Sequence, residues 1–130
     1  SPKMLKDLGV EFVVCGHSER RALGETSEEV SQKVRAILDH KMTPVICIGE
    51  TQRDQDGGHL DFIENEIIDS LDSVTASEYK KIIIAYEPIW AIGPGKTPPG
   101  AEYIEFVSRF IKDTAQEIYG FAPDVVFHTL

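Results

Sequence analysis

Short apolar runs alternate with helical patterns along this 130-residue chain, and this alternation restricts the possible folds more than any other feature. The first three runs are nearly continuous in apolar residues, as is typical of parallel strands that are covered on both faces. The sequence therefore predicts four strands, at residues 10–16, 43–48, 81–87 and 124–129.

Between the strands, apolar residues recur at the spacing of one helix face. Thr26 and Glu29 form a capping-box pattern, which predicts where the first of these helices begins. Residues 1–8 read as the end of an earlier helix that stops at Gly9. The predicted buried faces of the first and second helices consist of Val30, Val34, Ile37 and Leu38, and of Leu60, Ile63, Ile67 and Leu71.

The third helix follows two prolines, Pro98 and Pro99, which suit a first turn. Gly120 predicts its end, because glycine readily adopts the left-handed conformation that stops a helix. Its predicted apolar side consists of Ile104, Val107, Ile111 and Ile118.

Strict alternation of helices and strands implies an α/β fold with a parallel sheet and right-handed crossovers. The spacing of the strands fits either a doubly wound sheet or an arc of a (β/α)₈ barrel. We find no linker or second domain, so residues 1–130 are expected to form a single domain. A four-stranded arc leaves two open edges, so this domain is expected to be incomplete.

The net charge of −9 argues against nucleic acid or an anionic membrane surface as the main partner. No apolar run approaches the roughly 20 residues needed to span a bilayer, and the N-terminus does not resemble a signal peptide. Two cysteines, Cys15 and Cys47, lie inside apolar runs and do not make a disulfide framework. These features predict a cytoplasmic protein.

Active sites of parallel α/β folds gather at the carboxyl ends of the strands, where three residues stand out. His17 follows the first strand and precedes a turn whose backbone N–H groups favour a neutral ring that can donate a hydrogen bond. On spacing alone, a histidine that merely caps this turn is the commoner case. Glu50 follows the second strand, where a salt-bridge partner or helix cap is a commoner role than catalysis.

Glu87 ends the third strand, so its carboxylate should be partly removed from water, which suits a general base. The apolar residues 89–92 after it suit a lid that closes over a site and excludes water. Gly93 could bring a backbone N–H close to a phosphate. Alternatively, the segment is a buried loop in which Trp90 fills the core.

The sequence does not match the common nucleotide-binding or metal-binding motifs. A nucleotide phosphate loop needs glycine five positions before Gly95, where Trp90 stands. A dinucleotide fingerprint fails at its third glycine, where Pro98 stands. The four histidines are scattered and neither cysteine has a partner at ligand spacing, so we expect no metal and no cofactor.

Three segments together resemble the triosephosphate isomerase family: residues 16–21 (GHSERR), 47–50 (CIGE) and 85–93 (AYEPIWAIG). The resemblance covers essentially the whole chain, from the end of the third barrel helix to the seventh strand. It implies a partial (β/α)₈ barrel that interconverts dihydroxyacetone phosphate and glyceraldehyde 3-phosphate in glycolysis and gluconeogenesis. It also implies a homodimer when the chain is complete.

The resemblance further implies roles for individual residues. His17 would be the neutral electrophile, Glu87 the base, and Gly93 a backbone ligand of the phosphate. Residues 88–90 and 96–98 would be the lid hinges, although Pro94, Pro98 and Pro99 depart from the family pattern. The residues that would support the site are Ser18, Glu19, Cys47, Trp90 and Ile92.

Several parts of the family pattern are absent from the sequence. These are the asparagine-x-lysine pair after the first barrel strand, the dimer loop after the third, and the glycine-rich phosphate segments of the seventh and eighth. The leading alternative is therefore a non-catalytic fragment that only folds or self-associates. Another sugar-phosphate isomerase or aldolase on the same barrel is a weaker alternative, because the lid sequence argues against it.

Overall fold

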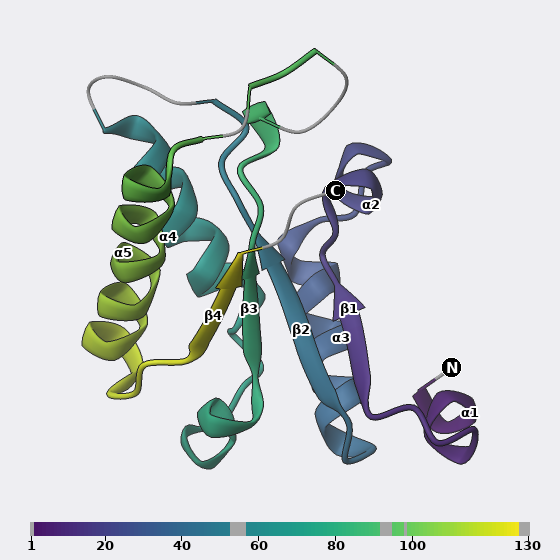
Figure 1. The fold of residues 1–130 in the computed structure, drawn as a ribbon. Coiled ribbons are helices and arrows are strands. Elements are labelled where there is room, and N and C mark those ends of the chain that lie inside the picture. Colours follow the sequence, from purple (N-terminus) through teal and green to yellow (C-terminus); the bar gives the residue numbers. More distant parts are fainter. Residues whose placement is uncertain (1, 53–56, 92–94, 98, 128–130) are drawn as a thin grey trace.

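The computed structural model describes residues 2–52, 57–91, 95–97 and 99–127. Within them, four parallel strands form one sheet in the order β1-β2-β3-β4 (Figure 1). The strands are β1 (Phe12–Cys15), β2 (Thr43–Ile48), β3 (Ile83–Tyr86) and β4 (Asp124–Phe127). All four predicted strands are confirmed; β1 and β3 are shorter than predicted, and the last two residues predicted for the fourth strand lie outside the described residues. Gly16, with φ +74°, follows the last residue of β1.

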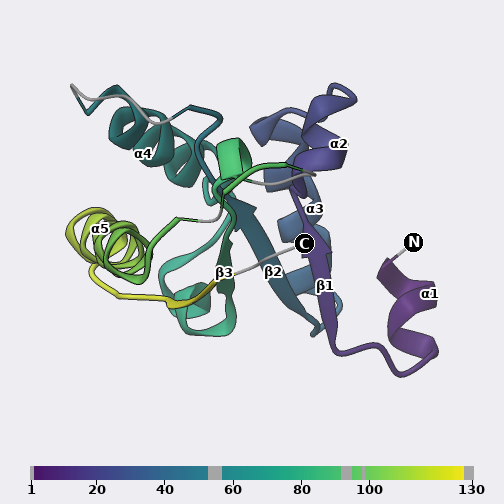
Figure 2. The same cartoon turned by 45° about the horizontal axis from the view of Figure 1, so that its top comes forward.

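Helices connect consecutive strands, as the alternation predicts. The helices are α1 (Pro2–Asp7), α2 (Ser18–Ala22), α3 (Ser27–Asp39), α4 (Gly58–Ser70) and α5 (Ala101–Tyr119), with two 3₁₀ turns, η1 (Ala76–Lys81) and η2 (Ile89–Ala91). Figures 1 and 2 place α3, α4 and α5 on the same face of the sheet. A doubly wound sheet would carry helices on both faces. The sequential strand order and one-sided helices therefore identify an arc of a barrel.

The core lies between the sheet and these three helices. The predicted faces of α3 and α4 are buried, except that Leu60 is only half-buried. In α5, Val107 and Ile111 are fully buried, but Ile118 is 42% exposed, so its prediction is wrong. Tyr119 contacts the core at that turn instead, with its ring 4.5 Å from that of Tyr79.

The ends of the helices follow local capping. Thr26 caps α3 by accepting a hydrogen bond from the Glu29 amide at 3.2 Å, as predicted. Gly120 ends α5 with φ +77°, also as predicted. The prediction that prolines occupy the first turn of α5 is wrong for Pro99, because extended backbone at Gly100 delays the helix until Ala101. Pro98 lies outside the described residues.

The face of the sheet away from the helices is apolar and open. Phe12, Val14 and Val126 alternate along their strands with core residues, and they are 56%, 59% and 48% exposed. The predicted coverage of both sheet faces is therefore wrong for the described chain. In the described part of the chain, no helix is long and apolar enough to cross a membrane.

An ion-pair cluster joins α3 to η1 at the edge of the core. Arg35 donates to both carboxylate oxygens of Glu78 and to the Ser73 carbonyl, and it also pairs with Asp39 at 2.8 Å. Hydrogen bonding to Arg35 lowers the pKa of Glu78 from 4.5 to about 2. The carboxylate of Glu78 therefore stabilises the fold when it is ionised.

We expect Glu78→Gln to destabilise the protein at pH 7 by about 1 kcal/mol, a value reduced by solvent screening of this partly exposed pair. The contribution is complete above the unfolded pKa of 4.5 and is lost as pH falls toward the folded value of about 2. Urea unfolding at several pH values measures it, with the exposed Glu117→Gln as control. A stability difference between Glu78→Gln and the parent that stays constant from pH 7 to pH 3 would contradict the assignment.

Candidate active site

The carboxyl ends of β1, β2 and β3 bring the predicted catalytic residues together. The Nε2 atom of His17 lies 3.7 Å from Oε2 of Glu87, although the two residues are 70 positions apart in the chain. The Ser18 amide donates a 2.8 Å hydrogen bond to Oε1 of Glu87. The three residues thus form one compact cluster at the ends of the strands.

His17 caps α2 and faces the site at the same time. Its Nδ1 accepts a hydrogen bond from the Glu19 amide at 3.2 Å. Since a backbone amide can only donate, Nδ1 carries no proton, and the neutral ring carries its proton on Nε2. The cap and the catalytic interpretation are therefore compatible, because the cap directs a ring N–H toward Glu87.

The carboxylate of Glu87 is almost completely withdrawn from solvent, since the residue is 1% exposed. Oε1 accepts from Ser18, whereas Oε2 has no hydrogen-bond partner among the described residues. An unpaired buried carboxylate oxygen is costly unless a bound molecule uses it. A buried carboxylate oxygen of this kind has the chemistry of a candidate general base.

Cys47 lies in β2 directly beside Ala85 of β3, two residues before the base. Burial raises the pKa of its thiol to about 12, and the nearby Glu87 charge acts in the same direction. The thiol therefore stays protonated, and Cys47 lies close to Glu87, whereas its supporting role stays a prediction.

Glu50 is fully buried, but it is neither an ion-pair partner nor a helix cap among the described residues. It accepts hydrogen bonds from the hydroxyls of Tyr86, at 2.7 Å and 3.1 Å, and Tyr103, at 3.0 Å. Burial raises its pKa, while the two tyrosines act to lower it. Among the described residues, the partners of Glu50 are therefore two tyrosines and not a cation or a helix end, because the fold brings α5 over the end of β2.

The first turn of the predicted lid is anchored to this cluster. The Ile89 amide donates to the Glu50 carbonyl at 3.0 Å, and the ring of Trp90 packs edge-on against Tyr103 with centroids 5.6 Å apart. Trp90 is half-buried. No local sequence signal pointed to Tyr103, since its partner Glu50 is 53 residues away.

The remaining predicted residues are placed differently or not described. Glu19 is exposed and contributes its backbone amide, not its carboxylate, to the His17 cap. Ile92 and Gly93, together with Pro94, lie outside the described residues. Lys96 and Thr97 at the predicted far hinge are exposed.

Sequence reasoning missed a buried ion pair beneath the site. Arg21 lies 3.7 Å from the carboxylate of Glu66, which in turn accepts a 2.8 Å hydrogen bond from the Gly49 amide. Burial raises the pKa of Glu66 to about 7, while Arg21 and the Gly49 amide act to lower it. The sequence signal that could have revealed this ion pair is the position of Glu66 on the buried face of α4.

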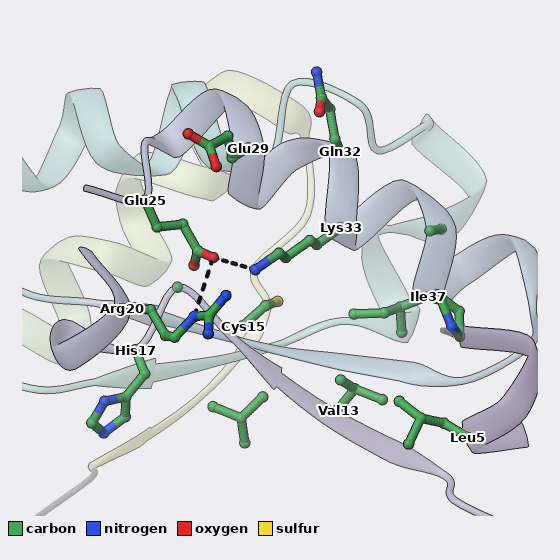
Figure 3. Close-up of a pocket in the computed structure, with 14 residues that line it drawn as sticks. Leu5, Val13, Cys15, His17, Arg20, Glu25, Glu29, Gln32, Lys33 and Ile37 are labelled. Atoms are coloured by element: carbon green, nitrogen blue, oxygen red, sulfur yellow. Dashed lines mark hydrogen bonds and ion pairs between the residues drawn. The ribbon is translucent and has the colours of Figure 1, made fainter. Parts of the chain in front are cut away.

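A pocket of about 570 Å³ lies behind the site, between β1, α2, α3 and α1. Glu25 is paired there with Lys33 and with Arg20, and His17 points away from this cluster (Figure 3). Burial acts to raise the pKa of Glu25, but these cations outweigh it and lower the pKa. The pocket lies along β1, and its lining includes His17 but not Glu87. Among the described residues, no cluster of three or more acidic, histidine or cysteine side chains could hold a metal ion.

Gly49 is required by a close backbone contact. A Cβ atom at this position would lie 1.7 Å from the Glu87 carbonyl oxygen.

We expect Gly49→Ala to destabilise the fold by about 3 kcal/mol, since the strand ends must separate to accept the methyl group. Urea unfolding measures this, and Gly100→Ala, where nothing lies within 4 Å, should change stability by about 1 kcal/mol at most. Equal effects of the two substitutions would contradict this account.

Comparison with known proteins agrees with the geometry. The family model described as triosephosphate isomerase matches residues 1–126. Relatives named triosephosphate isomerase include one from Pediococcus pentosaceus, 42% identical over 92% of this chain and 48% of its own length. Another, from Roseiflexus castenholzii, is 44% identical over 88% of this chain and 47% of its own length. The chain thus spans about half the length of the curated relatives it matches.

Proposed function

This chain belongs to the triosephosphate isomerase family, and on that premise we propose that the protein interconverts dihydroxyacetone phosphate and glyceraldehyde 3-phosphate. The observation that carries the proposal is the buried Glu87 carboxylate. Its Oε2 atom has no hydrogen-bond partner in the described part of the chain and lies 3.7 Å from Nε2 of His17. Glycolysis and gluconeogenesis are the pathways that this activity implies.

The two side chains have complementary tasks in this reaction. Glu87 removes a proton from the carbon next to the substrate carbonyl, and His17 donates the Nε2 hydrogen bond to the carbonyl oxygen, on which negative charge develops. The protonated Glu87 then returns the proton to the former carbonyl carbon, while the proton of the neighbouring hydroxyl passes to the former carbonyl oxygen, so that the carbonyl moves by one carbon. A base and an electrophile suffice for this transfer, so we propose no metal and no cofactor. Triosephosphate isomerase is itself the established case of a glutamate base paired with a neutral histidine, so these two roles follow the family.

Substrate binding is proposed to depend on the lid. Gly93 would donate its backbone N–H to the phosphate after closure, with hinges at 88–90 and 96–98, and Ile92 would help to exclude water. The anchored first turn at Ile89 and Trp90 supports a fixed near hinge.

The open face of the sheet supports a larger assembly. We propose that residues 1–130 form part of a single (β/α)₈ domain, whose other strands cover Phe12, Val14 and Val126, because barrel interiors of this type are filled with side chains. The family favours a homodimer. The two buried free thiols favour a reducing compartment, and with it a cytoplasmic location.

The base can be tested in a chimera in which residues 1–130 replace the matching segment of the Pediococcus pentosaceus relative. We expect Glu87→Gln to lower kcat by about 1,000-fold or more, because the amide cannot accept the proton. Circular dichroism checks the fold, and Glu105→Gln on the exposed side of α5 serves as the matched control. Full activity of Glu87→Gln would contradict the assignment of Glu87 as the base.

A second candidate concerns residues 1–130 as a separate polypeptide, which would fold or self-associate without catalysis. The open apolar face of the sheet favours it, since exposed patches of this kind promote association. We expect this polypeptide to show no isomerase activity above background and to sediment as an oligomer. Activity of the purified 14.5 kDa species would eliminate this candidate.

A further inference from the structure

The side chain of Arg21 lies between the ends of β1 and β2. It reaches back from α2 and is 14% exposed. Its Nε donates to the Gly16 carbonyl at 2.7 Å, and its Nη2 donates to the Cys47 carbonyl at 3.4 Å. One guanidinium therefore holds the carbonyls of two neighbouring strand ends.

Groups from α3 and α4 complete the surroundings of this guanidinium. Nη1 donates to Ser27 Oγ at 2.8 Å, and Nη2 donates to Ser70 Oγ at 3.2 Å. Glu66 of α4, which is 7% exposed, places Oε2 3.7 Å from Nη1. The planar fork of arginine suits this set of fixed acceptors, whereas the ammonium of lysine has no such geometry.

Arg21 and Glu66 together hold the backbone at the ends of β1 and β2, which adjoins His17 and Glu87. Gly16 directly precedes His17, and a Cβ on it would lie 2.8 Å from Nη2 of Arg21. The Gly49 amide donates to Glu66, and the Gly49 backbone packs on the backbone of Glu87 so closely that no Cβ fits. The pair is thus linked to His17 on one side and to Glu87 on the other.

We propose that Arg21 and Glu66 are positioning residues that set the separation between the His17 imidazole and the Glu87 carboxylate. This inference rests on the proposed isomerase function. Neither residue touches the reacting atoms, so each acts through the glycine that it holds. Small displacements of reacting groups lower rates strongly, by up to about 100-fold for 1 Å.

The energetics of the pair agree with a geometric role. Desolvation makes a buried ion pair a weak source of net stability, so stabilisation alone does not account for placing one here. Burial raises the pKa of Glu66 to about 7 despite the adjacent arginine, because removal from water disfavours the ionised carboxylate.

The first test is Arg21→Lys in the chimera described above. We expect kcat to fall by about 10-fold or more while KM stays within about 2-fold, because geometry between base and electrophile is disturbed and phosphate binding is not. Assays run well below the Tm of each variant, so that loss of folded protein does not contribute. An unchanged kcat would overturn the proposal.

Glu66 provides a second test that includes a conservative rescue. Glu66→Ala removes the acceptor for the Gly49 amide, and kcat should fall by about 10-fold. Glu66→Gln keeps an oxygen acceptor in place, and kcat should return to within about 3-fold of the parent. Equal kcat values for the alanine and glutamine variants would contradict positioning through Gly49.

Arg35→Lys is the matched control, because Arg35 is also ion-paired, with Asp39 and Glu78, but lies away from the site. It should lower Tm without changing kcat. An inactive parent chimera, or undiminished activity of Glu87→Gln, would refute the proposed function itself. An active, Glu87-dependent parent whose kcat does not respond to Arg21→Lys would refute only the positioning role.

Discussion

The parallel register of the sheet is the constraint on which the site depends. Cys15 pairs with Ile46, and Ile48 pairs with Tyr86, so the ends of β1, β2 and β3 reach the same edge. Because all the strands run in one direction, the residue that follows each strand emerges there. His17 and Glu87, which are far apart in the chain, therefore come within 3.7 Å.

Burying a carboxylate at this edge has a cost that local structure offsets only in part. The start of α2 supplies the Ser18 amide to one oxygen of Glu87, and the same turn supplies the Glu19 amide that fixes the His17 ring. One short helix thus hydrogen-bonds both members of the proposed acid–base pair. The second oxygen of Glu87 has no hydrogen-bond partner among the described residues, which is the state a general base needs before substrate arrives.

One face of the sheet is buried and the other is exposed. Helices α3, α4 and α5 cover one face and enclose a close-packed core (Figure 2). The other face presents exposed apolar side chains from β1 and β4. An arc of a barrel has this form, because the inner side chains of each strand pack against strands on the opposite side of the barrel.

The sequence by itself determined the strand and helix order, the buried faces of α3 and α4, and the roles of His17 and Glu87 as candidates, because periodicity and position after a strand are local properties. It placed Pro99 and Ile118 wrongly, since helix ends depend on backbone and packing that no periodicity reports. Only the tertiary structure distinguished an arc of a barrel from a doubly wound sheet. It also gave Glu50 two tyrosine partners and joined Arg21 to Glu66. Those contacts join residues 36 to 53 positions apart, and their geometry follows from how α4 and α5 pack across the sheet.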